Sequence, residues 1–161
     1  MTVDLPYAIH ALELGRMGNF IYVIHDRASD RAAVVDPAWD VPSIIALCER
    51  HGMRITDILL THSHFDHING VEALLNHGDA QLHLQRTDAA FWNRYLDLPT
   101  LHEGGDRIRL GETEIEILHN TRDHSRFKNM HRLVEDVRLC GYYGGIRLLK
   151  GGLGRAVIKT S

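Results

Sequence analysis

The order of the predicted elements places this chain in the mixed α/β class, with strands first and last and an alternation of helices and strands between them. Three segments carry that prediction. Residues 20–35 have the pattern of a β-hairpin, residues 40–84 alternate helical and strand patterns, and residues 106–119 have the pattern of a second hairpin. This order fits a mixed sheet with helices on its outer faces. At 161 residues the chain fits one domain, since about 100–200 residues per domain is typical.

Strands are expected first. Residues 7–14 fit a strand, and residues 15–19 fit a loop because they contain two glycines. Residues 20–24 are β-branched and aromatic, and residues 32–35 are small and apolar, so a polar turn between them would close a hairpin. The hairpin should end at Pro37, because proline has no N–H to donate to a neighbouring strand.

Helices and strands are then expected to alternate. Asp40 is a good N-cap for a helix whose apolar residues recur at helical spacing, and Gly52 would end that helix. Residues 55–60 are apolar enough for a strand that is covered on both faces. The later elements in this stretch are a short helix at residues 71–75, a short strand at 81–84 and a helix at 87–92.

Residues 106–119 form the clearest predicted hairpin. Apolar and charged residues alternate along both of its strands, so one face is expected to be buried and the other exposed to water. After this hairpin the periodicity weakens. We expect a helix at residues 130–137 and short strands at 146–149 and 156–158.

Composition excludes several classes of protein. Hydrophobic residues make up 44% of the chain and charged residues 24%, which is ordinary for a globular protein. No apolar run approaches the roughly 20 residues of a membrane-spanning helix, and the N-terminus lacks a signal-peptide pattern. Two cysteines give no disulfide framework, so we expect a cytoplasmic protein with no membrane partner. The net charge of −3 argues against a nucleic-acid partner.

The charge changes sign along the chain. Residues 1–119 contain 9 Lys and Arg against 18 Asp and Glu, a net charge of −9, whereas residues 120–161 contain 9 against 3, a net charge of +6. The latter segment also lacks proline. We therefore expect residues 1–119 to form one unit and residues 120–161 to form a divergent basic tail.

Residues 61–67 carry the strongest functional signal. His62, His64, Asp66 and His67 follow an apolar strand, and imidazole and carboxylate groups bind divalent metals when deprotonated. In an extended backbone His62, His64 and Asp66 share one side. If the chain turns into a helix after Phe65 instead, Asp66 and His67 point back into the same space from the start of that helix. Structural, hydrogen-bonded histidines are the simpler alternative, but so many buried polar groups without a metal would each need a partner.

The same residues 61–67 match the His-x-His-x-Asp-His signature of the metallo-β-lactamase-fold hydrolases, and the surrounding sequence resembles the glyoxalase II-like branch of that superfamily. Residues 18–24 resemble the opening strand of the family, and residues 33–38 resemble its strand that ends in an acidic residue beside the site. Residues 104–106 and the hairpin after them resemble the segment before the next ligand. The resemblance implies an αββα sandwich whose metals lie between the edges of two sheets.

The resemblance also implies a ligand set and a reaction. His62 and His64 would bind one metal, Asp66 and His67 a second, and His124 would supply a later ligand. The cofactor would be one or two Zn²⁺ ions, with Fe²⁺ as the alternative. A metal-bound hydroxide would hydrolyse a thioester or a related small-molecule acyl substrate, and Asp66 would be the catalytic residue that orients this nucleophile.

Other polar residues in this region have less specific signals. Asp36 could hydrogen-bond a ligand imidazole and fix its tautomer, or it could simply shape the turn before Pro37. The residues alone leave both interpretations open. The histidines expected at the surface are His25, His51, His77, His83 and His102.

After His119 the chain departs from the family pattern. The expected Gly-His-Ser/Thr-Pro-Gly turn is replaced by Asn-Thr-Arg-Asp-His-Ser-Arg, and the later metal-bridging Asp and last His have no counterpart. The sandwich is therefore expected to be incomplete in its second half. One alternative is a truncated, non-catalytic metal-binding remnant, whose uncovered sheet would favour a homodimer. The other is a mononuclear iron protein that resembles the sulfur dioxygenases.

Overall fold

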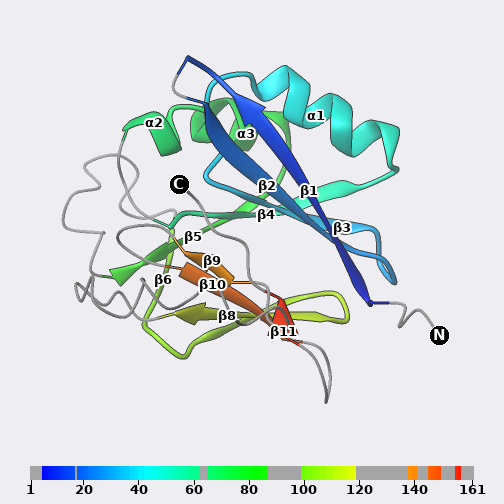
Figure 1. Cartoon of the computed structure of the whole chain (residues 1–161), viewed down its shortest axis with the longest axis vertical. Helices are drawn as coiled ribbons and strands as arrows, with labels where there is room; N and C mark the ends of the chain where they lie inside the picture. The colour runs from blue at the N-terminus through cyan, green and yellow to red at the C-terminus, as the bar shows by residue number, and fades with distance from the viewer. Residues whose placement is uncertain are drawn as a thin grey trace.

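Two β-sheets lie face to face in this computed structural model, and helices cover the outer face of the first sheet (Figure 1). These layers confirm the mixed α/β class. Among the described residues they are one layer of helices and the two sheets of the expected αββα sandwich. The structure describes residues 5–16, 18–61, 65–86 and 99–118, together with the backbone of residues 138–140, 145–149 and 155–156.

The first sheet contains six described strands, which lie in chain order. They are β1 (Tyr7–Leu14), β2 (Asn19–Asp26), β3 (Arg31–Val35), β4 (Arg54–Leu59), β5 (Gln81–Gln85) and β6 (Thr100–His102). Neighbours from β1 to β3 are antiparallel, whereas those from β3 to β6 are parallel. The connections from β3 to β4 and from β4 to β5 contain helices, which return the chain to the same end of the sheet. The C-terminal ends of β3 and β4 therefore meet at one edge.

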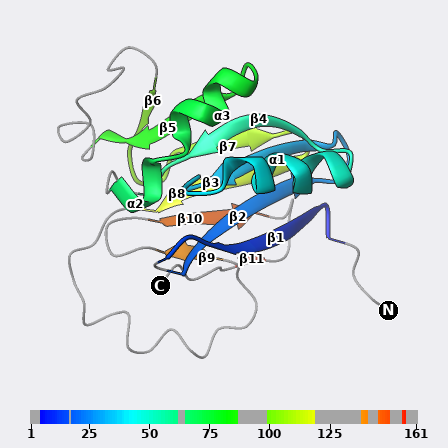
Figure 2. The same cartoon turned by 90° about the horizontal axis from the view of Figure 1, so that it is seen from above.

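The described residues form three helices. They are α1 (Val41–Arg50), α2 (Phe65–Ile68) and α3 (Val71–His77). The N-cap prediction is confirmed, because the Asp40 carboxylate accepts a hydrogen bond from the Ser43 backbone N–H at 3.1 Å. Gly52 follows the helix with a φ of +65°, a conformation that glycine adopts without steric cost. Figure 2 shows α1 and α3 lying across the first sheet, and Ile44 and Leu74 are buried beneath them.

The second sheet combines the predicted hairpin with strands from the basic segment. Its strands are β7 (Arg107–Leu110), β8 (Thr113–Leu118), β9 (Arg138–Cys140), β10 (Gly145–Leu149) and β11 (Arg155–Ala156). The hairpin prediction is confirmed by the antiparallel pairing of β7 with β8. β10 pairs antiparallel with β8, β9 and β11. The division of the chain into units 1–119 and 120–161 stays a prediction.

A hydrophobic core fills the space between the sheets, and a buried carboxylate links them at one end. Asp26 of β2 accepts hydrogen bonds from the Thr113 hydroxyl at 2.7 Å and from the Glu112 N–H at 3.2 Å. Burial alone would raise the pKa of Asp26, but these hydrogen bonds and those from Ser29 lower it overall. The apolar side chains buried between the sheets are Tyr7, Tyr22, Ile24, Ala33, Val35, Leu59, Ile108, Leu110, Ile115 and Ile117.

Most of the predicted elements are confirmed, with shifts of a few residues at their ends. The sequence does not predict β6, because three residues are too few to show a strand period. The helices predicted at residues 87–92 and 130–137 lie outside the described residues. Among the residues that are described, no helix is long and apolar enough to cross a membrane.

Candidate metal centre

The histidine-rich segment follows β4 in the chain and precedes Ile68, the last residue of α2, and both elements are labelled in Figure 1. The Leu60 N–H donates to the carbonyl of His83 in β5 at 3.0 Å, and the Asp36 N–H donates to the carbonyl of Leu59 at 2.9 Å. These backbone hydrogen bonds extend the pairing between strands as far as Leu60, the residue before the histidine-rich segment. The position at which the segment begins is therefore set by β3 and β5 on either side.

The structure describes two of the five predicted metal ligands. Asp66 and His67 lie in the first turn of α2, so for these two residues the helical alternative is the one observed. His62, His64 and His124 lie outside the described residues. Within the described part of the chain, no group of three or more His, Cys, Asp and Glu side chains is arranged to hold a metal ion. The complete ligand set therefore stays a prediction.

Asp36 connects the ends of β3 and β4 with α2. Its residue is 1% exposed, and its carboxylate accepts hydrogen bonds from the Thr61 N–H at 2.8 Å and the Thr61 hydroxyl at 2.5 Å. Its Oδ2 also lies 3.3 Å from Nδ1 of His67. The two interpretations of Asp36 are therefore compatible, because one carboxylate fixes the chain after β4 and contacts a candidate ligand imidazole.

His67 presents its two ring nitrogens to two carboxylates. Nδ1 faces Asp36, and Nε2 lies 3.4 Å from Oδ2 of Asp66. Burial alone would lower the pKa of His67, but the hydrogen bond and charge of Asp36 and the charge of Asp66 raise it overall. An imidazole held by one carboxylate, with its other nitrogen beside a second carboxylate, is a donor arrangement found at divalent-metal sites. Asp66 and His67 therefore supply two donors of the kind that a divalent-metal site uses.

Asn19 holds Asp66 from the start of β2. Its side-chain amide donates to the backbone carbonyl of Asp66 at 2.7 Å and to the Asp66 carboxylate at 3.2 Å. The sequence marks Asn19 only as part of residues 18–24, which resemble the opening strand of the family. It gives no sign of the contact with Asp66, because the two residues are 47 positions apart. Asn19 limits the rotation of the Asp66 side chain and so positions a candidate ligand.

A second polar cluster crosses β4, β5 and β6. Oδ1 of Asp57 lies 2.9 Å from Nε2 of His83, and Nδ1 of His83 lies 2.8 Å from Nε2 of His102. His83 is buried, so its predicted place at the surface is wrong, whereas His51 and His77 are exposed as expected. The sequence pattern missed this burial because the carboxylate that partners His83 lies 26 residues earlier.

The charge of Asp57 determines that Nε2 of His83 carries a proton. Burial alone would raise the pKa of Asp57, but hydrogen bonds from His83 and Thr56 and the charges of His83 and Arg31 lower it overall. Asp57 is therefore ionised, and His83 donates its Nε2–H to it. Burial and the neighbouring His83 lower the pKa of His102 against the opposing effect of Asp106. Nδ1 of His102 faces the Asp106 carboxylate at 3.6 Å, so a neutral His102 that carries its proton on Nδ1 accepts a hydrogen bond at Nε2 from Nδ1 of His83.

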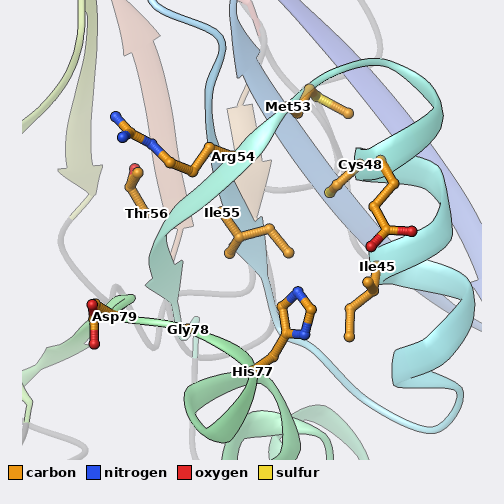
Figure 3. Close-up of a pocket in the computed structure, with 10 residues that line it drawn as sticks. Ile45, Cys48, Met53, Arg54, Ile55, Thr56, His77, Gly78 and Asp79 are labelled. Atoms are coloured by element: carbon orange, nitrogen blue, oxygen red, sulfur yellow. The ribbon is translucent and has the colours of Figure 1, made fainter.

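A separate cavity of about 470 Å³ lies between α1, β4 and the turn after α3. Figure 3 shows the side chains of Ile45, Ile55 and His77 converging on this space. Cys48 also lines it, and burial together with the charge of Glu49 raises the pKa of the Cys48 thiol to about 11. Because thiolates rather than thiols are nucleophilic, Cys48 is not poised for catalysis at neutral pH. Asp66 and His67, rather than Cys48, therefore remain the described candidates for metal binding and catalysis.

Comparison with known sequences gives two kinds of relative. The family profile described as the metallo-beta-lactamase superfamily matches residues 14–141. A hydroxyacylglutathione hydrolase from Fuscovulum blasticum is 38% identical over 112 residues, which are 68% of this chain and 42% of the relative. A probable polyketide biosynthesis zinc-dependent hydrolase from Bacillus subtilis (strain 168) is 29% identical over 119 residues, 72% of this chain and 52% of the relative. The chain spans about half the length of these curated relatives or less.

Comparison with solved structures supports the fold. A metallo-beta-lactamase from Staphylococcus aureus subsp. aureus COL superposes with a TM-score of 0.66 at 18% identity, covering 93% of this chain and 40% of the other. The chemotaxis sensor ODP, solved as a peroxy diiron species, superposes with a TM-score of 0.58 at 16% identity, covering 93% of this chain and 57% of the other. At these identities the similarity establishes a shared fold, and the fold occurs with iron as well as with zinc-dependent relatives.

Proposed function

The chain belongs to the metallo-β-lactamase superfamily, and from that premise we propose that it is a metal-dependent hydrolase of thioesters or related acyl compounds. The observation that carries the proposal is the arrangement Asp36–His67–Asp66, in which a buried carboxylate orients an imidazole toward a second carboxylate. The names of the two curated relatives support a hydrolase, and one of them names a glutathione thioester. The chain covers only part of either relative, so the activity of the whole protein is part of the proposal.

The proposed ligands are His62, His64, Asp66 and His67, with His124 as a fifth. We propose Zn²⁺ as the metal, because imidazole and carboxylate donors suit it and one relative is named as zinc-dependent. When bound, the metal would act as a Lewis acid and would lower the pKa of a water molecule to about 7.

The remaining chemistry is assigned to side chains of this protein. The Asp36 carboxylate accepts a hydrogen bond from Nδ1 of His67. The other ring nitrogen, Nε2, then faces Asp66. Asn19 restrains the Asp66 carboxylate, which would orient the attacking water. The water oxygen adds to the thioester carbonyl carbon, the carbon–sulfur bond breaks, and the products are a carboxylic acid and a thiol that receives the proton of the water.

Metal content and thioester turnover test this proposal together. The purified chain is expected to contain about one or two zinc ions, measured by mass spectrometry that also quantifies iron, and to release thiol from an acyl thioester. Asp66→Ala should lower kcat/KM about 100-fold, because it removes a group that acts on the reacting water. Asp79→Asn, a change at an exposed carboxylate outside the site, is the control.

Two outcomes would contradict the proposal. A folded, zinc-loaded chain without thioester turnover would favour the non-catalytic remnant. Full activity of Asp66→Ala would remove Asp66 from the mechanism.

A further inference from the structure

The helix α2 is too short to hold its own position. It contains four residues, Phe65–Ile68, and none of them is buried. An isolated helix of this length is unstable in water, because too few hydrogen bonds form for the backbone that is ordered. The candidate ligands Asp66 and His67 therefore depend on contacts with other elements, two of which come from Asn19 and Asp36.

A third contact joins the end of α2 to the loop at residues 36–39, which follows β3. Asn69 directly follows α2, and its side-chain Oδ1 accepts a hydrogen bond from the Trp39 N–H at 2.6 Å. The next residue, Gly70, donates its N–H to the carbonyl of Pro37 at 3.0 Å. An added Cβ on Gly70 would lie 2.9 Å from that carbonyl oxygen. The loop therefore packs directly against the end of α2.

This loop has a strained backbone at both ends. The φ of Asp36 is +50° and that of Trp39 is +66°, in the left-handed region that favours glycine. Such conformations persist only where the surrounding contacts enforce them. For Trp39 these contacts are the hydrogen bond to Asn69 and the packing of its indole on Gly15, where an added Cβ would come within 2.4 Å of the ring.

The contact between the loop and His67 is sensitive to small movements. Oδ2 of Asp36 lies 3.3 Å from Nδ1 of His67, slightly beyond the usual N–H···O range of about 2.7–3.2 Å. A further separation of a few tenths of an ångström would break this hydrogen bond. Asn69 holds the other end of the loop against α2, so it limits that separation.

Ending the helix is the simpler role for Asn69, since asparagine often follows the last residue of a helix. In that role asparagine has a positive φ, which Asn69 does not have. Its side chain instead bonds to a residue 30 positions earlier in the chain. The hydrogen bond to Trp39 therefore indicates a role in joining two elements.

We propose that Asn69 is a positioning residue of the candidate metal centre. Its side chain, bonded to the Trp39 N–H, keeps the loop at residues 36–39 against α2. The Asp36 carboxylate then stays within reach of Nδ1 of His67. The inference rests on the proposed function and adds to the site a residue that does not itself contact metal or substrate.

A double-mutant cycle on zinc affinity is the first test. Asn69→Ala should weaken zinc binding about tenfold, because it loosens the carboxylate that orients a ligand imidazole. In the Asp36→Asn background the same substitution should have almost no further effect, because the contact through which Asn69 acts is already lost. Competition with a chromophoric chelator measures the four affinities. Factors that simply multiply would show that Asn69 does not act through Asp36, and would overturn the inference.

Asn76→Ala is the matched control. Asn76 is an exposed asparagine of α3, and its substitution should leave zinc affinity unchanged. Asn69→Asp should recover most of the affinity that Asn69→Ala loses, because a carboxylate oxygen also accepts the Trp39 N–H. Asn69→Asp in the Asp36→Asn background measures the attraction of the added charge alone. A recovery no larger than that attraction would contradict the proposal.

The tautomer of His67 in the metal-free protein is the second test, and it needs neither zinc nor turnover. At about pH 9, above the range in which histidines titrate, imidazole ¹⁵N chemical shifts show which ring nitrogen carries the proton. Wild-type His67 should carry it on Nδ1, which donates to Asp36. In Asn69→Ala the shifts should move toward those of the exposed His77. A His67 tautomer unchanged by Asn69→Ala would overturn the inference.

These outcomes separate the inference from the proposed function. Coupling between Asn69 and Asp36 in a zinc-binding chain that hydrolyses no thioester would keep the positioning role and reject the hydrolase. Thioester turnover and zinc affinity that are both insensitive to Asn69→Ala would keep the hydrolase and reject the positioning role. If wild type binds no zinc, the proposed function fails, and the His67 tautomer alone decides whether Asn69 positions this imidazole.

Discussion

Asp36 has the densest set of polar contacts at the candidate centre, and most of its effect on function should pass through His67. The buried carboxylate bonds to Thr61 on the chain that leads into the histidine segment and to Nδ1 of His67. An orienting carboxylate of this kind raises the basicity of the imidazole and fixes its tautomer. We therefore expect Asp36 to strengthen metal binding without contacting the metal.

Asp36→Asn should weaken zinc binding about 10- to 100-fold, because an amide cannot supply the same charge to His67. Competition with a chromophoric chelator measures the affinity. Asp40→Asn is a close control, since Asp40 is an exposed helix N-cap and asparagine caps equally well. Zinc affinity of Asp36→Asn equal to that of wild type would show that Asp36 serves the turn alone.

Asp57→Asn should destabilise the fold by about 1–3 kcal/mol, because it removes the charge that receives the Nε2–H of the buried His83. Urea unfolding of the metal-free protein measures the change in free energy. Asp79→Asn at an exposed position should have almost no effect. A loss of stability no larger than that of the control would mean that the hydrogen bond to His83 contributes little.

At the scale of elements, one tight turn joins the β7–β8 hairpin to the first sheet. Gly111 has a φ of +59°, and a Cβ built on it would lie 2.2 Å from Oδ2 of Asp26 and 2.3 Å from the Ser29 hydroxyl. Asp26 itself bonds to the two residues that follow this glycine. A side chain at residue 111 would therefore displace Asp26 and Ser29 or move the hairpin away from the first sheet.

Gly111→Ala should destabilise the protein by about 2 kcal/mol more than Gly52→Ala. Gly52 has a φ of +65°, close to the +59° of Gly111, but an added Cβ there meets nothing within 4 Å. Both variants carry the cost of a left-handed alanine, about 1–2 kcal/mol, so their difference isolates the contact with Asp26. Urea unfolding midpoints measure it, and equal midpoints would show that the turn relaxes away from Asp26 at no cost.

Local patterns predicted the elements whose residues interact with near neighbours. The N-cap Asp40 is visible in the sequence because its partner Ser43 lies three residues later, and the β7–β8 hairpin is visible because its residues alternate with a period of two. The contacts of Asn19 and His83 are not visible, because their partners lie 47 and 26 residues away. The motif pointed to Asp66 and His67, and the sequence already offered Asp36 as a partner for a ligand imidazole, but Asn19 could be identified only once the fold brought β2 and α2 together.

Across the whole molecule, two partly buried histidines make stability depend on pH. Burial lowers the pKa of His10, and the neighbouring His51, His25 and Arg27 lower it further. The His10 ring lies with its centroid 4.6 Å from that of His51 and 6.3 Å from that of His25. Burial and His83 lower the pKa of His102. Both histidines take up a proton more readily in the unfolded chain, where the pKa is about 6.5.

The sign of the effect follows from that difference. Stability from a histidine with a lowered pKa is complete above about pH 6.5 and is lost as the pH falls through the lower pKa of the folded state. The pKa values of Asp26 and Asp57 are also lowered, but these groups act below about pH 4, where carboxylates titrate. The pKa of His67 is raised, so its protonation stabilises the folded state as the pH falls. This contribution cancels when two proteins that both contain His67 are compared.

We therefore expect the free energy of unfolding of metal-free wild type, relative to that of His102→Gln, to decrease between pH 7.5 and pH 5.5. Glutamine keeps a hydrogen-bond acceptor near the position of Nε2 but cannot be protonated, so the comparison removes the titration of His102 while His67 is common to both proteins. Urea unfolding at several pH values supplies the free energies. His51→Gln, at an exposed position, should alter the pH dependence less than His10→Gln, since burial lowers the pKa of His10. A difference between wild type and His102→Gln that stays constant with pH would show that the pKa of His102 is the same in the folded and unfolded protein.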